Sequence, residues 1–336
     1  MKLKNIAATA LSLALSARRV RRQLRTYDLR GRVVAVTGGS RGLGLQLARE
    51  LMRRGARVAI CGRQTSSLDA ARADLELLGE VLAVQCDVRV AEQASNFMRA
   101  VVDRFGALDV VINNAGTITV GPLDTMTIED YREAMETHLW GPLNIVTAAL
   151  PELRRARGRI VNIASIGGLV SVPHLLPYSV SKFALVGLSE GLGAELQQSG
   201  VRVITVCPGL MRTGSPKNAW FKGNRTGEHT WFHLADTLPL SSISAGKAAR
   251  QTVDALVNGR RFVVLSAPAR LAARFHGNFP GLTVSLLSLV ARTLPKAKDG
   301  DTGRALGSQS ESAITRSPLT TLGRKAEVDL NQSPSG

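Results

Sequence analysis

Tyr178 and Lys182 stand four residues apart, and this spacing makes them candidates for proton transfer. In a helix, side chains at i and i+4 lie on one face, about one turn apart. An unperturbed tyrosine has a pKa of about 10 and is a weak acid or base near neutrality. One unit charge at about 4 Å, at an effective dielectric of about 20, supplies about 4 kcal/mol, enough to lower that pKa by about three units. Because such a pair alone is common and usually structural, the surrounding sequence has to show whether this one is catalytic.

A serine thirteen residues upstream, Ser165, supplies part of that context. It follows the apolar run 159–164, which reads as a strand, and it precedes Ile166-Gly167-Gly168. In open α/β folds the reacting groups lie over the carboxyl ends of the strands. Ser165 is a candidate partner of Tyr178 through the family resemblance given below.

A glycine-rich turn follows the first apolar run, with the sequence Thr37-Gly38-Gly39-Ser40-Arg41-Gly42-Leu43-Gly44, and an amphipathic helix begins there. Glycines let the backbone approach a pyrophosphate, and the helix N-terminus directs N–H groups at it. A strand before the glycines and a helix after them are the context that this motif requires. The expected cofactor contacts of this turn are Gly38, Ser40, Arg41, Gly42, Leu43 and Gly44.

The end of the second strand predicts which dinucleotide binds. NAD-binding domains usually place a carboxylate there for the ribose 2′-hydroxyl, but Gly62 occupies that position and Arg63 follows it. Guanidinium groups bind phosphate through paired, charge-assisted hydrogen bonds. Arg41 and Arg63 therefore favour NADP(H) over NAD(H). The alternative is that one or both arginines only face solvent.

Together these motifs resemble the short-chain dehydrogenase/reductase family. The turn has the family's TGxxxGxG spacing, whereas extended, epimerase-like relatives place the middle glycine one residue earlier. The resemblance continues in Asp87-Val88, in Asn113-Asn114-Ala115-Gly116, in the Ser165, Tyr178 and Lys182 set, and in the segment from Pro208-Gly209 to Thr213.

The resemblance implies roles for these residues. Ser165 would hydrogen-bond the substrate oxygen, Tyr178 would transfer the proton, and Lys182 would also hold the nicotinamide ribose, while the nicotinamide supplies hydride. Asn113 would support the sheet and the cofactor. The remaining implied cofactor contacts are Asp87 and Val88 at the adenine, Asn114, Ala115 and Gly116 after the fourth strand, and Pro208, Gly209 and Thr213 at the carboxamide. No metal is expected.

His138 departs from the family pattern. Relatives commonly carry an asparagine there that anchors a water in a proton relay, but this sequence reads Thr137-His138-Leu139. A histidine can hold a water or carry a proton itself. We keep two interpretations open, a modified relay that makes His138 catalytic and a purely structural histidine.

The elements that must position these residues alternate between short β-branched runs and amphipathic helices. Strands are expected near 33–37, 57–61, 81–85, 108–113, 159–164, 201–207 and 262–266, and helices beginning near residues 42, 67, 91, 127, 177 and 244. The predicted fold class is α/β, a single Rossmann-type, doubly wound, seven-stranded parallel sheet with helices on both faces.

Length and composition fit one large domain with extensions. The 336 residues are 44% apolar, with a net charge of +17. The first thirty residues carry +7 of this +17, and their basic side chains attract anionic surfaces. Because no nucleic-acid recognition motif accompanies this charge, we expect an anionic membrane surface and no nucleic acid. Three cysteines without paired spacing are interpreted as buried small hydrophobes in a reducing compartment.

The expected domains are a basic amphipathic N-terminal segment (1–27), a catalytic domain (28–270) with a substrate lid (214–240), an apolar helical extension (271–295) and a disordered tail (296–336). Disorder is expected in the tail because it is rich in Ser, Thr, Gly and charged residues. The N-terminal apolar run is too short to span a bilayer, and it favours an in-plane surface helix, with packing on the protein body, packing on a second subunit, or a signal as alternatives. The lid holds four aromatic residues, which either cover a lipophilic substrate or pack the lid onto the sheet or a second subunit.

The sequence therefore predicts an NADP(H)-dependent oxidoreductase that interconverts a carbonyl and an alcohol on a small, apolar substrate of steroid, retinoid or fatty type. The expected location is cytoplasmic, with peripheral attachment at the cytoplasmic membrane face, and a homo-oligomer is compatible with the outward-facing helices. Two alternatives stay open: a cofactor-binding regulatory or scaffold protein without turnover, and a non-redox relative such as an epimerase or dehydratase. Substrate identity and physiological direction are not predicted.

Overall fold

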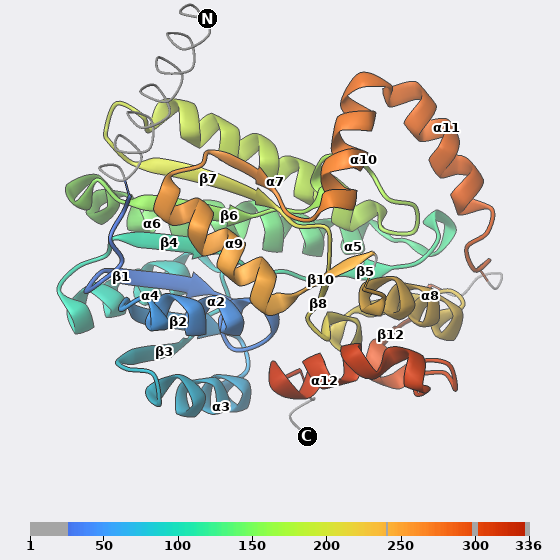
Figure 1. Ribbon diagram of the computed structural model, residues 1–336, viewed down its shortest axis with the longest axis horizontal. Helices are drawn as coiled ribbons and strands as arrows, with labels where there is room; N and C mark the ends of the chain where they lie inside the picture. Colours follow the sequence, from blue (N-terminus) through green and yellow to red (C-terminus); the bar gives the residue numbers. More distant parts are fainter. Residues whose placement is uncertain (1–25, 240, 298–301, 333–336) are drawn as a thin grey trace, which may run out of the picture.

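A seven-stranded parallel sheet forms the centre of the computed structural model, which describes residues 26–239, 241–297 and 302–332 (Figure 1). The strand order is β11-β7-β6-β4-β1-β2-β3. The strands are β1 (Val33–Thr37), β2 (Arg57–Gly62), β3 (Val81–Gln85), β4 (Val110–Asn113), β6 (Arg159–Ile163), β7 (Arg202–Cys207) and β11 (Phe262–Val264). The predicted fold class is confirmed, and each predicted strand lies within two residues of an observed one at either end.

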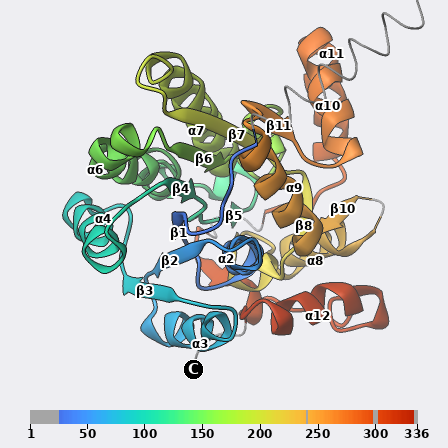
Figure 2. The ribbon, with the colours of Figure 1, turned by 60° about the vertical axis from the view of Figure 1, so that its left-hand side comes forward.

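Helices cover both faces of this sheet, as Figure 2 shows. On one face lie α2 (Gly42–Arg53), α3 (Thr65–Glu76) and α9 (Ala245–Asn258), and on the other lie α4 (Ala91–Phe105), α6 (Gly141–Ala156) and α7 (Leu176–Glu195). In β1, Val34 and Val36 point into the first layer, while Val33 and Ala35 point into the second. Because both faces are covered, the strand is apolar at nearly every position instead of alternating.

Two small sheets extend the fold beyond the strands that the sequence predicts. One consists of β5 (Thr119–Val120), β9 (Trp220–Lys222) and β12 (Arg304–Leu306), and the other pairs β8 (Leu210–Arg212) with β10 (Ser242–Ser244). The 214–240 insertion contains β9 and the helix α8 (Arg225–Thr237). Phe221 and Phe232 are buried in a cluster with Val120 and Leu175. These two rings therefore pack the insertion onto the body of the protein.

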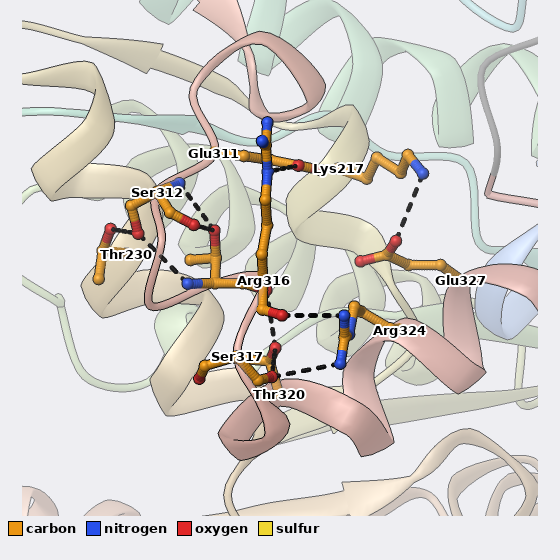
Figure 3. Close-up of polar contacts among 10 residues, drawn as sticks. Lys217, Thr230, Glu311, Ser312, Arg316, Ser317, Thr320, Arg324 and Glu327 are labelled. Carbon is orange, nitrogen blue, oxygen red and sulfur yellow. Dashed lines mark hydrogen bonds and ion pairs between the residues drawn. The ribbon is translucent and has the colours of Figure 1, made fainter.

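The tail differs from the sequence prediction, because residues 302–332 are ordered, with β12 and the helix α12 (Thr321–Asp329) packed beside α8 (Figures 1 and 2). Polar contacts replace a large apolar core: the Thr230 hydroxyl donates to Ser312 Oγ at 2.9 Å, and the Arg324 guanidinium donates to the Arg316 and Ser317 carbonyls (Figure 3). The prediction of disorder is wrong here because composition does not report hydrogen bonds that the rest of the chain supplies.

The helical extension consists of α10 (Ala267–Asn278) and α11 (Pro280–Ala291), which project from the body in both views (Figures 1 and 2). Within the described residues, no helix is both long and apolar enough to cross a membrane. The predicted N-terminal helix lies outside the described residues.

Candidate active site

A cavity of about 500 Å³ lies over the carboxyl ends of the central strands. It extends from the glycine-rich turn to Tyr178 and Lys182, so it brings together two motifs that are 140 residues apart. Its lining includes most residues predicted to contact a cofactor: Gly38, Ser40, Arg41, Gly42, Leu43, Gly44, Arg63, Asp87, Val88, Asn114, Ala115, Gly116, Tyr178, Lys182 and Thr213. Pro208 and Gly209 do not line it, and the Pro208 carbonyl instead accepts a hydrogen bond from the Ile166 N–H at 2.7 Å.

The glycine-rich turn is packed tightly enough to require glycine. A Cβ on Gly44 would lie 2.1 Å from the Gly38 carbonyl oxygen and 2.5 Å from Asn114 Nδ2. The Asn114 side-chain amide donates to the carbonyls of Thr37 and Gly38 at 3.0 and 3.1 Å, which joins β4 to the turn. The turn thus brings backbone without side chains to the start of α2, as a pyrophosphate site requires, and the Gly42 N–H at this point donates to the Leu330 carbonyl at 2.9 Å.

Two arginines lie together at the far end of the cavity. Burial lowers the pKa of Arg41, and the charge of Arg63 lowers it further, so the two guanidinium groups are close enough to repel each other. Asp87 forms an ion pair with Arg89 at 2.6 Å, and the charge of Arg63 also lowers the pKa of its carboxyl. Burial works against ionisation of Asp87, but the hydrogen bonds from Arg89 outweigh it and lower the pKa of the carboxyl. The Arg41 and Arg63 pair therefore favours an anion.

Ser165, Tyr178 and Lys182 come together at the other end. Ser165 precedes a short 3₁₀ turn (Ile166–Gly168), where its hydroxyl accepts from the Gly167 N–H at 3.0 Å, and its side chain lies close enough to Tyr178 to lower the pKa of that phenol. Ser165 is not itself among the residues that line the cavity, whereas Tyr178 and Lys182 are. The Lys182 ammonium donates to the Ile163 carbonyl at 2.9 Å and lies 5.7 Å from the centre of the Tyr178 ring.

The protonation behaviour of this set differs from the simple expectation of a lysine-tuned tyrosine. Burial raises the pKa of Tyr178 to about 12, and the hydrogen bond from Ser165 opposes this rise. Burial lowers the pKa of Lys182 to about 7. The described residues alone therefore do not activate Tyr178 as a base, because desolvation outweighs the contribution of Ser165, which lowers the pKa of Tyr178.

His138 lies in a π-helical turn (Glu136–Trp140) between α5 (Ile128–Met135) and α6, and its side chain is buried. Its Nε2 accepts from the Thr117 N–H at 3.2 Å, and its Nδ1 lies 2.7 Å from the Ser181 hydroxyl. Burial, with the charge of Lys182, holds the pKa of His138 well below its usual range. Both ring nitrogens are therefore engaged with the protein, which favours the structural interpretation over the relay.

A buried chain of polar side chains supports the site from below. Asn113 donates to Asn162 Oδ1 at 2.8 Å, Asn162 donates to Ser189 Oγ at 2.9 Å, and Ser189 lies 2.7 Å from the Thr205 hydroxyl. These contacts join β4, β6, β7 and α7, the elements that present the motifs. The predicted role of Asn113 in supporting the sheet agrees with this geometry.

Sequence reasoning missed several cavity residues: Arg89, Ile118, Asn218 and Gln332. Trp220, one of the four aromatic residues of the predicted lid, does line the cavity. Arg89 follows the predicted cavity residue Asp87 by two positions, and this pairing of opposite charges in the sequence could have indicated that Arg89 lies at the site. Gln332 carried none, because it is 119 residues from Thr213, whose carbonyl it contacts. The described residues contain no group of three or more His, Cys, Asp or Glu side chains that could hold a metal, and all three cysteines are free and buried.

A parallel seven-stranded sheet with a glycine turn and a Ser-Tyr-Lys set defines a nucleotide-binding oxidoreductase fold. The short chain dehydrogenase family model matches residues 32–222, more than half of the chain. The chain therefore belongs to the short-chain dehydrogenase/reductase family, for which a nicotinamide cofactor and a small-molecule substrate are typical.

Curated relatives agree with this assignment. A putative ketoacyl reductase of Streptomyces coelicolor is 40% identical over 185 residues, which are 54% of this chain and 71% of that protein. An 11-beta-hydroxysteroid dehydrogenase-like protein (4A) of Arabidopsis thaliana is 31% identical over 259 residues, 76% of this chain and 83% of that protein.

Among solved structures, a short-chain dehydrogenase/reductase from Burkholderia phymatum in complex with NAD superposes with a TM-score of 0.69. It is 22% identical, and the match covers 76% of this chain and 96% of the other. At this identity the likeness shows the fold alone.

Proposed function

We propose that this protein is an NADP(H)-dependent oxidoreductase that interconverts a carbonyl and an alcohol on a lipophilic small molecule, with Tyr178 as the proton-transfer group. The observation that carries the proposal is a single cavity that contains the glycine-rich turn, the Arg41 and Arg63 pair, and Tyr178 with Lys182. A nicotinamide bound there supplies the hydride.

The chain's own residues handle the proton. In reduction, the Tyr178 hydroxyl donates its proton to the carbonyl oxygen, while the Ser165 hydroxyl donates a hydrogen bond that orients this oxygen. Before the substrate binds, the Ser165 side chain lowers the pKa of Tyr178. Lys182 is held on the Ile163 carbonyl, so its ammonium stays beside the ring. In oxidation, Tyr178 accepts the proton instead, which requires its pKa to fall from about 12. Positive charge near the ring supplies that change.

Tyr178→Phe tests the chemistry. The variant should bind NADPH as the unchanged protein does and lose turnover on a panel of steroid, retinoid, fatty-acyl and small polar carbonyls, because it keeps the ring and removes only the proton. NADPH oxidation with NADH in parallel is the measurement. Val180→Ala, an exposed position two residues away on the same helix, is the control. If the unchanged protein turns over no carbonyl on the panel, or if Tyr178→Phe keeps its rate, the proposed reaction is wrong.

Arg41→Ala and Arg63→Ala test the cofactor preference. Hydrogen bonds to a charged group contribute about 1.5–3 kcal/mol each, so each variant should weaken NADPH binding at least tenfold and leave NADH binding within about twofold. Equal losses for the two cofactors would contradict the preference for NADP(H).

The substrate end of the cavity supports a lipophilic ligand. Ile118, Met211 and Trp220 line the same cavity as Tyr178, and apolar walls with a few placed polar groups are typical of sites for apolar ligands. The named relative from Arabidopsis thaliana is described as steroid dehydrogenase-like, which is compatible with such a substrate. We expect higher kcat/KM for apolar than for polar carbonyls of equal size.

The projecting pair α10 and α11 supports attachment to an anionic membrane face. Five large apolar residues of α11 are about half exposed or more (Leu282, Val284, Leu286, Leu289 and Val290). The helix carries no charge, while Arg270 and Arg274 lie on α10. An apolar surface beside basic side chains fits the boundary of an anionic bilayer.

Flotation with liposomes tests this attachment. The protein should float with vesicles of anionic lipid and less with neutral ones, and Leu286→Asp with Leu289→Asp should reduce flotation at least fivefold. Val328→Asp, an exposed apolar position on α12, is the matched control. If the protein does not float with either kind of vesicle, the proposed membrane attachment is wrong. A concentration-dependent dimer that is lost in the same double variant would instead assign α11 to contact with a second copy of the chain.

A further inference from the structure

Residues 329–332, which we call the C-terminal clasp, lie on the glycine-rich turn. The Gly42 N–H donates to the Leu330 carbonyl at 2.9 Å. The Asn331 side-chain amide donates to the carbonyls of Ser40 and Ser67 at 2.9 and 3.0 Å. The clasp therefore contacts the element that would hold the cofactor pyrophosphate.

Gln332 reaches furthest into the site. Its side chain lines the cavity and the residue is 4% exposed. Its Nε2 donates to the Thr213 carbonyl at 2.9 Å, while its backbone oxygen and its Oε1 accept from Asn218 Nδ2 at 3.0 and 2.8 Å. The donor and the acceptor of the Gln332 amide are thus both used within the site.

Asn218 links Gln332 to Arg41 through hydrogen bonds to both residues. Because Gln332 binds the nitrogen of the Asn218 amide twice, the amide oxygen faces the other way, and Arg41 donates to it at 2.9 Å. Arg41 needs such an anchor, since Arg63 repels it. A neutral acceptor holds the guanidinium in place and leaves its positive charge for an anion.

Contacts further along the tail hold the clasp in position. The Arg49 guanidinium donates to the Asp329 carbonyl at 3.0 Å. Lys217 pairs with Glu327 at 3.4 Å, as Figure 3 shows. The Glu311–Arg316 pair and the contact between Thr230 and Ser312 fix the preceding turns (Figure 3). The clasp is therefore anchored at several points besides Gln332.

We propose that Gln332 is a positioning residue of the cofactor site, which through Asn218 holds Arg41 available to the 2′-phosphate of NADP(H). This inference rests on the proposed NADP(H) preference. It makes the C-terminal segment, far from the nucleotide motifs in sequence, a determinant of the choice between NADP(H) and NAD(H).

The test uses the full chain carrying Gln332→Ala, with dissociation constants for NADPH and NADH measured by titration calorimetry. Loss of an anchoring hydrogen bond of about 1 kcal/mol should raise the NADPH constant about fivefold and leave the NADH constant within twofold. Val328→Ala, an exposed position of α12, should change neither constant, and the melting temperatures of both variants should match that of the unchanged protein.

A double variant separates the route of action from a merely structural effect. If Gln332 acts through Arg41, then Gln332→Ala adds nothing to the NADPH/NADH ratio of Arg41→Ala, because both changes interrupt one chain of contacts. Additive effects on the ratio would overturn the inference. An equal loss of affinity for NADPH and NADH would also overturn the inference, because the clasp would then only line the cavity. Tighter binding of both cofactors would overturn it too, because the clasp would then compete with the cofactor.

The two proposals fail differently. If Arg41→Ala leaves the NADPH/NADH ratio unchanged, the proposed cofactor preference fails and the clasp inference fails with it. If Arg41→Ala shifts the ratio and Gln332→Ala does not, only the clasp inference is wrong.

Discussion

Lys222 and Asp130 form a buried ion pair that joins β9 to the start of α5, and Lys222→Met should destabilise the protein by about 3–5 kcal/mol. The ammonium lies 2.6 Å from the carboxylate, and the two side chains are 3% and 4% exposed. At an effective dielectric of about 20 this distance corresponds to an attraction of about 6 kcal/mol, which desolvation of both ions partly offsets. Removing the lysine leaves a buried carboxylate whose remaining partners are the N–H and hydroxyl of Thr127.

Urea unfolding measures this loss as a shift in midpoint at constant m-value. Arg155→Met is the matched control, because Arg155 pairs with Glu152 at the same 2.6 Å but is 75% exposed; it should cost less than about 1 kcal/mol. The double variant Lys222→Met with Asp130→Asn should recover part of the loss by removing the stranded charge. Equal shifts for Lys222→Met and Arg155→Met would refute the reasoning that burial makes the pair costly to break.

Two further predictions concern acid stability and the glycine turn. Burial lowers the pKa of His229 to about 4. Between pH of about 6.5 and 4 the imidazole is therefore neutral in the folded protein but takes up a proton in the unfolded chain. The free energy of unfolding should be unaffected above pH of about 6.5 and decline by about 3 kcal/mol as the pH falls toward 4. The decline in urea midpoint across that range should be smaller in His229→Phe, although His233 and His138, whose pKa values burial also lowers, keep part of it. A profile unchanged by the substitution would contradict the assignment. Gly44→Ala should weaken cofactor binding at least tenfold, because the new Cβ would lie 2.1 Å from the Gly38 carbonyl oxygen. Gly191→Ala, at a helix position with nothing within 4 Å, should leave the titration unchanged.

The central sheet could be predicted because local pattern and tertiary environment agree there. β1 is a run of apolar residues buried on both faces, and Gly42 begins a helix directly after it. Such a strand–turn–helix unit can be identified from the local sequence, so the residues of the turn that line the cavity could be predicted by residue number. The helices starting at Thr65 and Ile128 were displaced by only one or two residues from their predicted starts, which is the normal uncertainty of helix ends.

The small sheets and the tail could not be predicted in the same way, because their stability comes from partners far along the chain. β12 has three residues and pairs antiparallel with β9, which lies more than eighty residues earlier. Three residues carry no periodicity, and the surrounding polar composition is typical of disorder. The contacts that order this segment, such as Asn218 with Gln332, are side-chain hydrogen bonds whose partners no local pattern identifies.

His138 shows why residue type alone could not separate chemistry from structure. Its Nε2 accepts a backbone N–H from Thr117, so the remaining ring proton sits on Nδ1 and points to Ser181, whose hydroxyl in turn donates to the Tyr178 carbonyl at 2.9 Å. Because burial and Lys182 keep the imidazole neutral, it has neither a free nitrogen for a water nor the basicity to take a proton. We infer that His138 acts by holding the start of α7 in place, and that the proton on Tyr178 reaches solvent by a path that does not include the imidazole.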